Sequence, residues 1–289
     1  MGDALHITSG DIVGDMLREC GIPGDVCVWH DVLYDGPRRA GWPDEPTCMA
    51  RARFLVAGTA GALDGKRVLE TVHKQYHRLA AAGAFAEIVL WFDACLFDQA
   101  MLAHILTCLR HQGLRNVKLL CVAAFPGIVP YHGLGQLTPA QLAGCYGDRR
   151  PVTDTQFQFA GRVDEAFATQ ELGLLSALGE ATDAPLPWVP AAVRRWLEEW
   201  PDAATGLGRL ERLALQAIRG GCATPRDILA AVAAAETPPQ FWGDTTLWAK
   251  INGLADRNPP LVCIEGPAER LPQWNATDSL NAFRITRAG

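Results

Sequence analysis

The chain has no apolar run of the roughly 18 residues needed to cross a bilayer. Its first residues, Met1 to Ala4, show neither the basic nor the apolar stretch of a secretory signal peptide. These absences predict a cytoplasmic protein with no membrane partner.

Paired-cysteine motifs are also missing. No two of the 9 cysteines are separated by only two residues, which argues against a zinc ribbon and a thioredoxin-type redox pair. Most lie in apolar sequence, as Cys27 and Cys121 do, which is typical of reduced thiols buried as small hydrophobic side chains. His73 and His77 share one helical face, as do His104, Cys108 and His111. Too few strong ligands lie near these groups to predict a metal site.

Positive charge is in deficit. The formal net charge is −6, which disfavours a dedicated binder of nucleic acid or of acidic membranes. A local basic face can still lie within an acidic total.

Strand and helix patterns alternate in the first part of the chain. Strands are predicted over residues 4–8, 25–29, 87–92 and 116–122, with helices over 12–20, 66–82 and 98–112. This order predicts an α/β fold with a Rossmann-like, mainly parallel sheet that has helices on both faces. We expect the strands ending at Thr8 and Phe92 to be close parallel neighbours.

The domain prediction has three parts. Residues 1–185 form the α/β domain, with a helical extension from about 138, where Thr138, Pro139 and Gln141 predict a helix start. Residues 186–205 form a linker helix. Residues 206–289 show three helices followed by two strands, which is the outline of a winged helix.

The charge of residues 206–289 indicates whether this region binds nucleic acid. Residues 206–289 contain nine Lys and Arg against eight Asp and Glu, and the third predicted helix offers only Lys250 and Arg257. A DNA-reading helix normally carries several cations directed at phosphates. Nucleic-acid binding is therefore disfavoured but stays open beside protein packing or a homodimer.

Candidate site residues lie where the parallel strands are predicted to end, because ligands of open α/β sheets bind at those ends. The catalytic candidates are Asp11, His30, Asp93 and Cys95, and the ligand-binding candidates are Thr8, Ser9, Gly10, Trp29, Arg53, Trp91, Asp98 and Gln99. We expect Asp11 and Asp93 to line one pocket.

The chemistry of these candidates leaves alternatives open. Paired carboxylates such as Asp93 and Asp98 can act as acid and base or bind a divalent cation. Arg53 with the Trp29 and Trp91 rings would suit an anionic, nucleotide-like ligand. Each candidate also has a purely structural alternative. These are helix capping for the acids, core packing for the rings and a surface ion pair for the arginine. No nucleophile, base and orienting group form a recognisable triad.

Several ordered motifs resemble those of a known family. They are His6-Ile7-Thr8-Ser9-Gly10-Asp11, Asp35-Gly36-Pro37, Arg53-Phe54-Leu55, Leu90-Trp91-Phe92-Asp93 and Gly133-Leu134-Gly135-Gln136. On these motifs the first part of the chain resembles the bacterial domain of unknown function 1835. The last part, with Phe241-Trp242-Gly243-Asp244, looks like its frequent partner, domain of unknown function 3658. The resemblance implies no established activity.

One segment departs from the family pattern. It usually reads Trp-Phe-Glu-His-Asp-Leu at the strand end, whereas this chain has Asp93, Ala94 and Cys95. Either the chemistry that needs the missing His and Asp is absent here, or Cys95 has taken it over.

Two functions from different classes follow. In the first, the α/β domain is a small-molecule enzyme or binding protein for an anionic, phosphorylated or nucleotide-like ligand. In the second, it senses a ligand while the winged-helix-like part regulates transcription or binds another protein. The acidic total favours the first, and the sequence identifies no cofactor.

Overall fold

The computed structural model describes residues 2–59, 63–272 and 279–288. The chain divides into two compact units. The larger unit contains residues 1–54, 65–195 and 238–240, and the smaller unit contains residues 55–64, 196–237 and 241–289. Among the described residues, no helix is both long enough and apolar enough to span a membrane.

A five-stranded sheet forms the centre of the larger unit. Its strands are β1 (Gly2–Ser9), β2 (Asp25–Trp29), β3 (Phe85–Asp93), β4 (Val117–Val122) and β5 (Arg150–Pro151). The spatial order is β2-β1-β3-β4-β5, and the first four strands are parallel. The prediction of an α/β fold with a mainly parallel sheet is confirmed.

The neighbouring pair β1 and β3 is also confirmed. Thr8 lies opposite Trp91 in a parallel register, so both strands end at the same edge of the sheet. In this strand order the chain first adds β2 on one side of β1 and then β3 on the other. A doubly wound sheet binds its ligands at such a switch point, outside the carboxyl ends of the two central strands.

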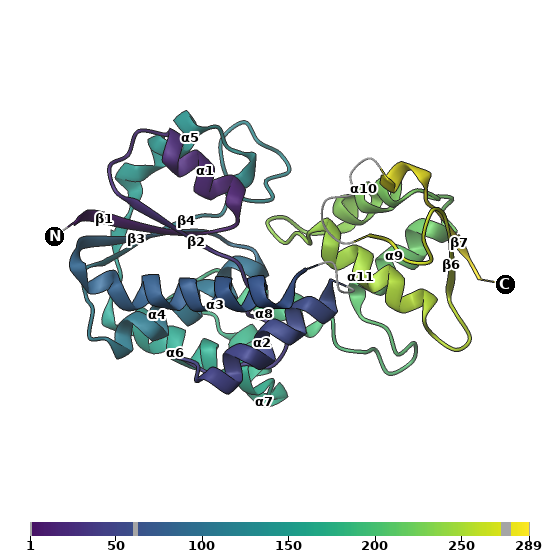
Figure 1. The fold of residues 1–289 in the computed structure, drawn as a ribbon, viewed down its shortest axis with the longest axis horizontal. Helices are drawn as coiled ribbons and strands as arrows, with labels where there is room; N and C mark the ends of the chain where they lie inside the picture. The colour runs from purple at the N-terminus through teal and green to yellow at the C-terminus, as the bar shows by residue number, and fades with distance from the viewer. Residues whose placement is uncertain (1, 60–62, 273–278, 289) are drawn as a thin grey trace. The chain divides into compact units, whose positions relative to one another are not determined.

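Helices cover both faces of the sheet (Figure 1). The helices of the larger unit are α1 (Asp11–Glu19), α2 (Glu45–Gly58), α3 (Gly65–Ala80), α4 (Leu96–His111), α5 (Pro139–Cys145), α6 (Asp154–Thr169), α7 (Leu172–Glu180) and α8 (Val189–Leu197), the second and the last continuing into the smaller unit. Short 3-10 turns of the larger unit are η1 (Ala81–Ala84), η2 (Leu134–Gln136) and η3 (Tyr146–Asp148), and η4 (Ser279–Ala282) lies in the smaller unit. Figure 1 shows α1 and α5 on one face of the sheet and α3, α4 and α6 on the other.

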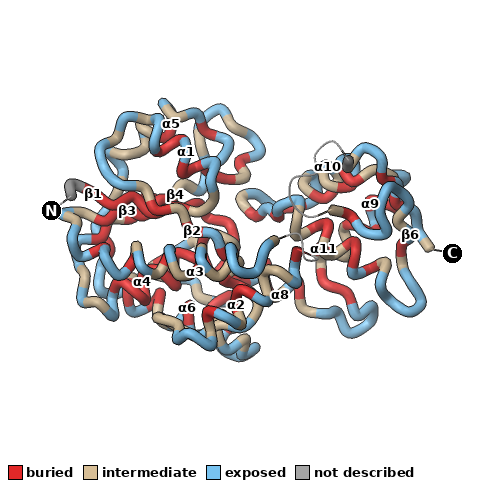
Figure 2. Tube along the Cα trace, viewed as in Figure 1, coloured by how far each residue is buried: buried red, intermediate tan, exposed pale blue. Residues whose placement is uncertain are grey.

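The apolar pattern explains these layers. On the face of α1 and α5, Val13, Leu17 and Leu142 pack with Val89 and Trp91 of the sheet. On the other face, every residue of α4 from Asp98 to Leu109 is buried. Most of these residues are apolar, as expected for a helix enclosed in the core, and the polar ones among them form hydrogen bonds. Figure 2 accordingly shows the buried residues gathered along β1, β3 and α4.

The edge strand β5 contradicts one prediction from the sequence. The sequence predicts a mainly helical stretch from residue 138 to about 178, but Arg150 and Pro151 pair antiparallel with Leu119 and Lys118. The helix start within that stretch is confirmed, because Thr138 and Gln141 form a reciprocal capping box at the start of α5.

The smaller unit contains three helices and a pair of strands. They are α9 (Arg209–Arg219), α10 (Pro225–Ala235), α11 (Asp244–Ala255), β6 (Val262–Glu265) and β7 (Arg284–Arg287). The two strands are antiparallel, with Ile264 opposite Ile285. The predicted order of elements is present in this part of the chain.

Candidate functional site

The switch point brings the ends of β1 and β3 together. Gly10 follows β1 with a φ of 69°, a left-handed value that favours glycine. Its N–H donates to the carbonyl oxygen of Trp29 at 3.3 Å, which ties this turn to the end of β2. Helix α1 begins at the next residue, Asp11.

Two carboxyl groups meet beyond the end of β3. The Asp98 carboxylate accepts a hydrogen bond from the backbone N–H of Asp93 at 2.7 Å, and a second from the Ser9 side chain. Asp93 Oδ1 accepts from the backbone N–H of Cys95 at 2.9 Å. Both carboxyl groups are buried. Asp93 and Asp98 therefore hold the turn before α4 and form an enclosed acidic pair. Neither acts as the helix cap that the structural alternative expected, because the N-cap residue of α4 is Cys95 and its side chain makes no cap hydrogen bond.

Burial sets the protonation of this pair. It raises the pKa of Asp93, although the hydrogen bonds from Cys95 oppose the shift. It raises the pKa of Asp98 well above the ordinary range, and the neighbouring charge of Asp93 adds to the effect. No lysine or arginine in the described part of the chain forms an ion pair with either carboxyl. Two close carboxyl groups without a cation favour a state in which they hold a proton.

Cys95 lies beside the pair. Burial raises the pKa of its thiol well above the ordinary value of 9.0, and the charges of Asp93 and Asp98 act in the same direction. The thiol therefore stays protonated, which opposes a role as a nucleophile. Asp93, Cys95 and Asp98 each offer a ligand atom, and these atoms lie within 4.8 Å of one another. They are the residues of this edge that could hold a cation.

A loop before α5 covers Asp93. Gly133 has a φ of 142°, and a Cβ atom there would overlap with Oδ2 of Asp93. The backbone N–H of Leu134 also bonds to the Asp93 carboxylate. Sequence reasoning did not place this loop in the site. Its signal was the Gly133-Leu134-Gly135 segment among the family-like motifs.

Asp11 and His30 form a second, exposed pair. The His30 Nε2 atom lies 2.9 Å from Asp11 Oδ1, and the two side chains are 41% and 75% exposed. The structure thus brings the catalytic candidates together in two groups, one exposed and one buried. Among the described residues no hydrogen bond or ion pair joins Asp11 to Asp93, and their shared pocket stays a prediction.

The predicted aromatic wall is wrong. Trp29 and Trp91 are both at 0% exposure, and their rings pack against other core side chains instead of forming an open wall. Trp91 stacks on Tyr146 and donates its indole N–H to His6 Nδ1. Trp29 packs edge-on against Tyr76. Both rings are core residues.

Two further candidates hold the strand ends. The Thr8 hydroxyl donates to the carbonyl oxygen of Trp91 at 3.1 Å and so links β1 to β3. The Gln99 amide donates to the carbonyl oxygen of Asp93 at 2.6 Å. Both side chains are buried, so these contacts position the edge of the sheet.

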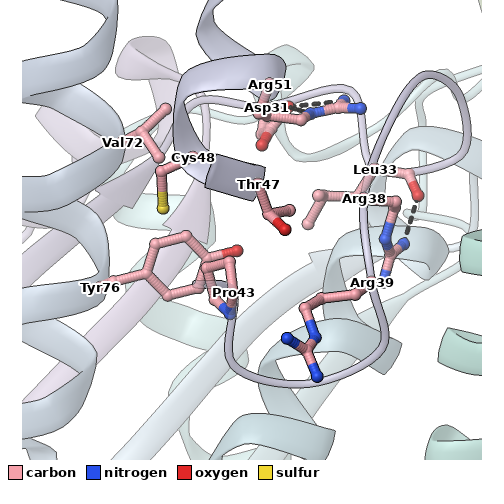
Figure 3. Close-up of a pocket in the computed structure, with 10 residues that line it drawn as sticks. All are labelled: Asp31, Leu33, Arg38, Arg39, Pro43, Thr47, Cys48, Arg51, Val72 and Tyr76. Atoms are coloured by element: carbon pink, nitrogen blue, oxygen red, sulfur yellow. Dashed lines mark hydrogen bonds and ion pairs between the residues drawn. The ribbon is translucent and has the colours of Figure 1, made fainter. Parts of the chain in front are cut away.

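Arg53 is exposed on α2, and the buried arginine of this helix is Arg51. Its Nε atom donates to Asp31 Oδ1 at 2.8 Å, while its other nitrogens donate to the carbonyl oxygens of Val32 and Asp35. Arg51 therefore clamps the loop that follows β2 (Figure 3). The sequence analysis missed Arg51. The feature that could have identified it is its spacing of three residues from the apolar Cys48, which places both on the buried face of α2.

A buried polar network was also missed. The Tyr76 hydroxyl contacts His104 Nε2 at 2.7 Å, and His104 Nδ1 lies 3.0 Å from Asp164 Oδ1. Arg38 pairs with the same aspartate, and the Gly41 N–H donates to its second oxygen at 2.7 Å. Burial lowers the pKa of His104 well below its ordinary value, so the imidazole is neutral. Residues this far apart in the sequence leave no local pattern.

No family model matches this chain, and no curated protein matches it.

Proposed function

We propose that the larger unit is a small-molecule enzyme or binding protein whose ligand lies at the carboxyl ends of β1 and β3. The observation that carries this proposal is the buried acidic pair, Asp93 and Asp98, at the switch point of the sheet. Ionisable groups with shifted pKa values at such a position are typical of functional sites.

The pair supplies a proton to the ligand or takes one from it. A carboxyl that keeps its proton toward neutral pH is an effective general acid, and its ionised partner is a base. The exposed imidazole of His30, which follows β2, lies 2.9 Å from Asp11 at the start of α1 and is a second candidate to exchange a proton with the ligand.

The charge of the ligand is left open in this proposal. An anionic, nucleotide-like ligand would depend on Arg53 and the two tryptophans. Arg53 lies exposed on α2, and the Trp29 and Trp91 rings are sealed in the core. No cation pairs with Asp93 or Asp98 in the described part of the chain. The proposed ligand is therefore a small molecule that gains or loses a proton.

The experiment compares small molecules that copurify with the full chain, identified by mass spectrometry. The variants are Asp93→Asn and Asp11→Asn, with Asp15→Asn as the control, because Asp15 is an exposed acid of α1 that pairs with the exposed Arg18. We expect molecules retained by the wild type and the control to be lost from both test variants, with similar melting temperatures. Equal retention by Asp93→Asn would contradict the proposal.

A second candidate function rests on the smaller unit. Three helices followed by an antiparallel pair of strands have the order of elements of a winged helix, which supports a regulator or interaction module. The observation against DNA is that Lys250 is the only cation within α11. This function is the alternative, and a titration with duplex DNA tests it.

A further inference from the structure

Three residues late in the sequence return to the larger unit. Pro238, Pro239 and Gln240 belong to this unit, whereas the residues on both sides of them belong to the smaller unit. We call these three residues the strap. Pro238 is exposed, Pro239 is half-buried and Gln240 is buried. The strap therefore places its one polar side chain in the interior of the larger unit.

The Gln240 amide holds the turn between β3 and α4 at two points. Its Oε1 atom accepts a hydrogen bond from the N–H of Leu96 at 3.0 Å, and its Nε2 atom donates to the carbonyl oxygen of Ala94 at 3.1 Å. Leu96 is the first residue of α4, so its N–H has no acceptor within the helix. A residue 144 positions further along the chain supplies that acceptor.

The same turn holds the acidic pair. The N–H of Cys95, which lies between the two points held by Gln240, donates to Asp93 Oδ1 at 2.9 Å. Ala94, Cys95 and Leu96 are all buried. A buried polar group without a partner costs stability and binds water where there is room for it. Gln240 satisfies the polar groups on both sides of Cys95 and so keeps water away from the turn beside Asp93.

A ligand of the acidic pair needs part of its cover to move, because Asp93 is 7% exposed and Asp98 is 2% exposed. In the loop before α5, the backbone N–H of Leu134 bonds to the Asp93 carboxylate itself. The strap differs, since the two hydrogen bonds of Gln240 go to the backbone of the turn and to neither carboxyl. The Gln240 side chain can therefore leave without breaking a hydrogen bond of the pair.

We infer that the strap is a gate for the acidic site and that Gln240 is the residue that fastens it. While Gln240 is in place, the turn is closed and dry. When Gln240 leaves, the carbonyl oxygen of Ala94 and the N–H of Leu96 are free to bind water or a ligand beside the pair. The inference concerns the regulation of this site and rests on the proposed function for the role of the pair. The closing of the turn is testable without a ligand.

The two prolines suit a gate that closes with a small loss of entropy. The proline ring fixes φ, so an unfastened strap has fewer conformations than a segment of other residues. Fastening Gln240 therefore removes less conformational entropy. Proline also lacks an N–H, so Pro238 and Pro239 bring no backbone donor that needs a partner when the strap closes.

The test is the rate at which iodoacetamide alkylates Cys95 in the full chain at one fixed pH, measured by mass spectrometry of its peptides. We expect Gln240→Ala to raise this rate about tenfold or more, because the turn opens locally more often when its two backbone groups lose their partners. Gln240→Met keeps the length of the side chain and removes only the amide, and it should raise the rate as well.

Cys27 and Cys108 are the internal controls, because both thiols are buried and lie in β2 and near the end of α4. Their rates should stay at the wild-type values. A residue that only stabilises the fold would change all three rates together. Gln216→Ala is the matched control variant, since Gln216 is an exposed glutamine of α9, and it should change none of them.

Three results would overturn the inference. The first is a wild-type rate for Cys95 in both Gln240 variants. The second is an increase in Gln240→Ala alone, which would assign the effect to lost volume and not to the amide. The third is an equal increase for Cys27 and Cys108, which would indicate general destabilisation. The proposed function fails by a different measurement, the equal retention of copurified molecules by Asp93→Asn, so the two failures are distinguishable.

Discussion

Asp98 shows how one enclosed carboxyl couples the fold to pH. Its pKa in the folded protein lies well above the ordinary value of 3.8, because of burial and the charge of Asp93. In the unfolded chain it titrates near the ordinary value. The folded protein therefore binds more protons than the unfolded chain above about pH 4, so its stability falls as pH rises through this window.

We expect Asp98→Asn to remove this dependence. Asparagine keeps an oxygen that accepts the hydrogen bond from the Asp93 N–H, but it carries no charge. The melting temperature of the variant, relative to that of the wild type, should rise as pH is raised from about 4 to about 8. Thermal unfolding across this range measures it. The exposed Asp15→Asn variant is the control, and a difference for Asp98→Asn that is independent of pH would contradict the prediction.

The positions of some site residues could be predicted from the sequence, and those of others could not. The positions of Asp93, Asp98 and Ser9 at one edge follow from the strand ends, since parallel neighbours end together. The prediction that Arg53 binds a ligand rested on residue type, and Arg51 was missed because its place on the buried face of α2 was not considered. The burial of both tryptophans depends on neighbours such as Tyr146 and Tyr76, which come from distant segments.

Among the elements, α4 and α6 depend on one buried ion pair. Asp164 of α6 contacts His104 of α4 and neutralises Arg38 of the loop between β2 and α2. All three side chains are almost fully enclosed. Removing one member of such a pair leaves a charge without a partner in the core.

We expect Asp164→Leu to cost roughly 3–5 kcal/mol of unfolding free energy, the usual penalty for an uncompensated buried charge. The double variant Arg38→Met with Asp164→Leu removes both charges and should recover most of that loss. Urea denaturation measures the three proteins. A double variant no more stable than the single one would show that the charge is not the cause.

Most elements could be predicted because each carries its own signal. Periodicity located the four parallel strands and the helices between them, and the Thr138 and Gln141 pair located the start of α5. The two-residue strand β5 could not be found this way, because Arg150 and Pro151 are too few to show an alternating pattern. The loop over Asp93 was missed for a similar reason, since its contacts come from residues about 40 positions later in the sequence.

The two candidate functions belong to different units of the chain: the enzyme or binding function to the larger unit, and the regulator function to the smaller unit. The described part of the smaller unit has three α-helices followed by two strands, and Lys250 is the one cation within α11. Phosphate contacts by Lys and Arg supply most non-specific affinity for DNA and make it dependent on salt. A near balance of charge in this part of the chain therefore predicts little affinity.

Titration of labelled duplex DNA with the full chain should give only weak binding at low salt, and binding should disappear as salt is raised. Fluorescence anisotropy at two salt concentrations measures this. Tight binding that survives about 200 mM salt would contradict the prediction and would place the regulator function above the enzyme function.

The outermost strand of the sheet has a consequence for aggregation. An unpaired sheet edge can recruit a strand from another molecule, and proteins block this with proline, with charge and with short edge strands. β5 combines all three, because it is two residues long and consists of an exposed arginine and an exposed proline. Proline has no N–H to offer an incoming strand. Arg150 and Pro151 therefore make this edge of the sheet a poor template for a strand from another molecule.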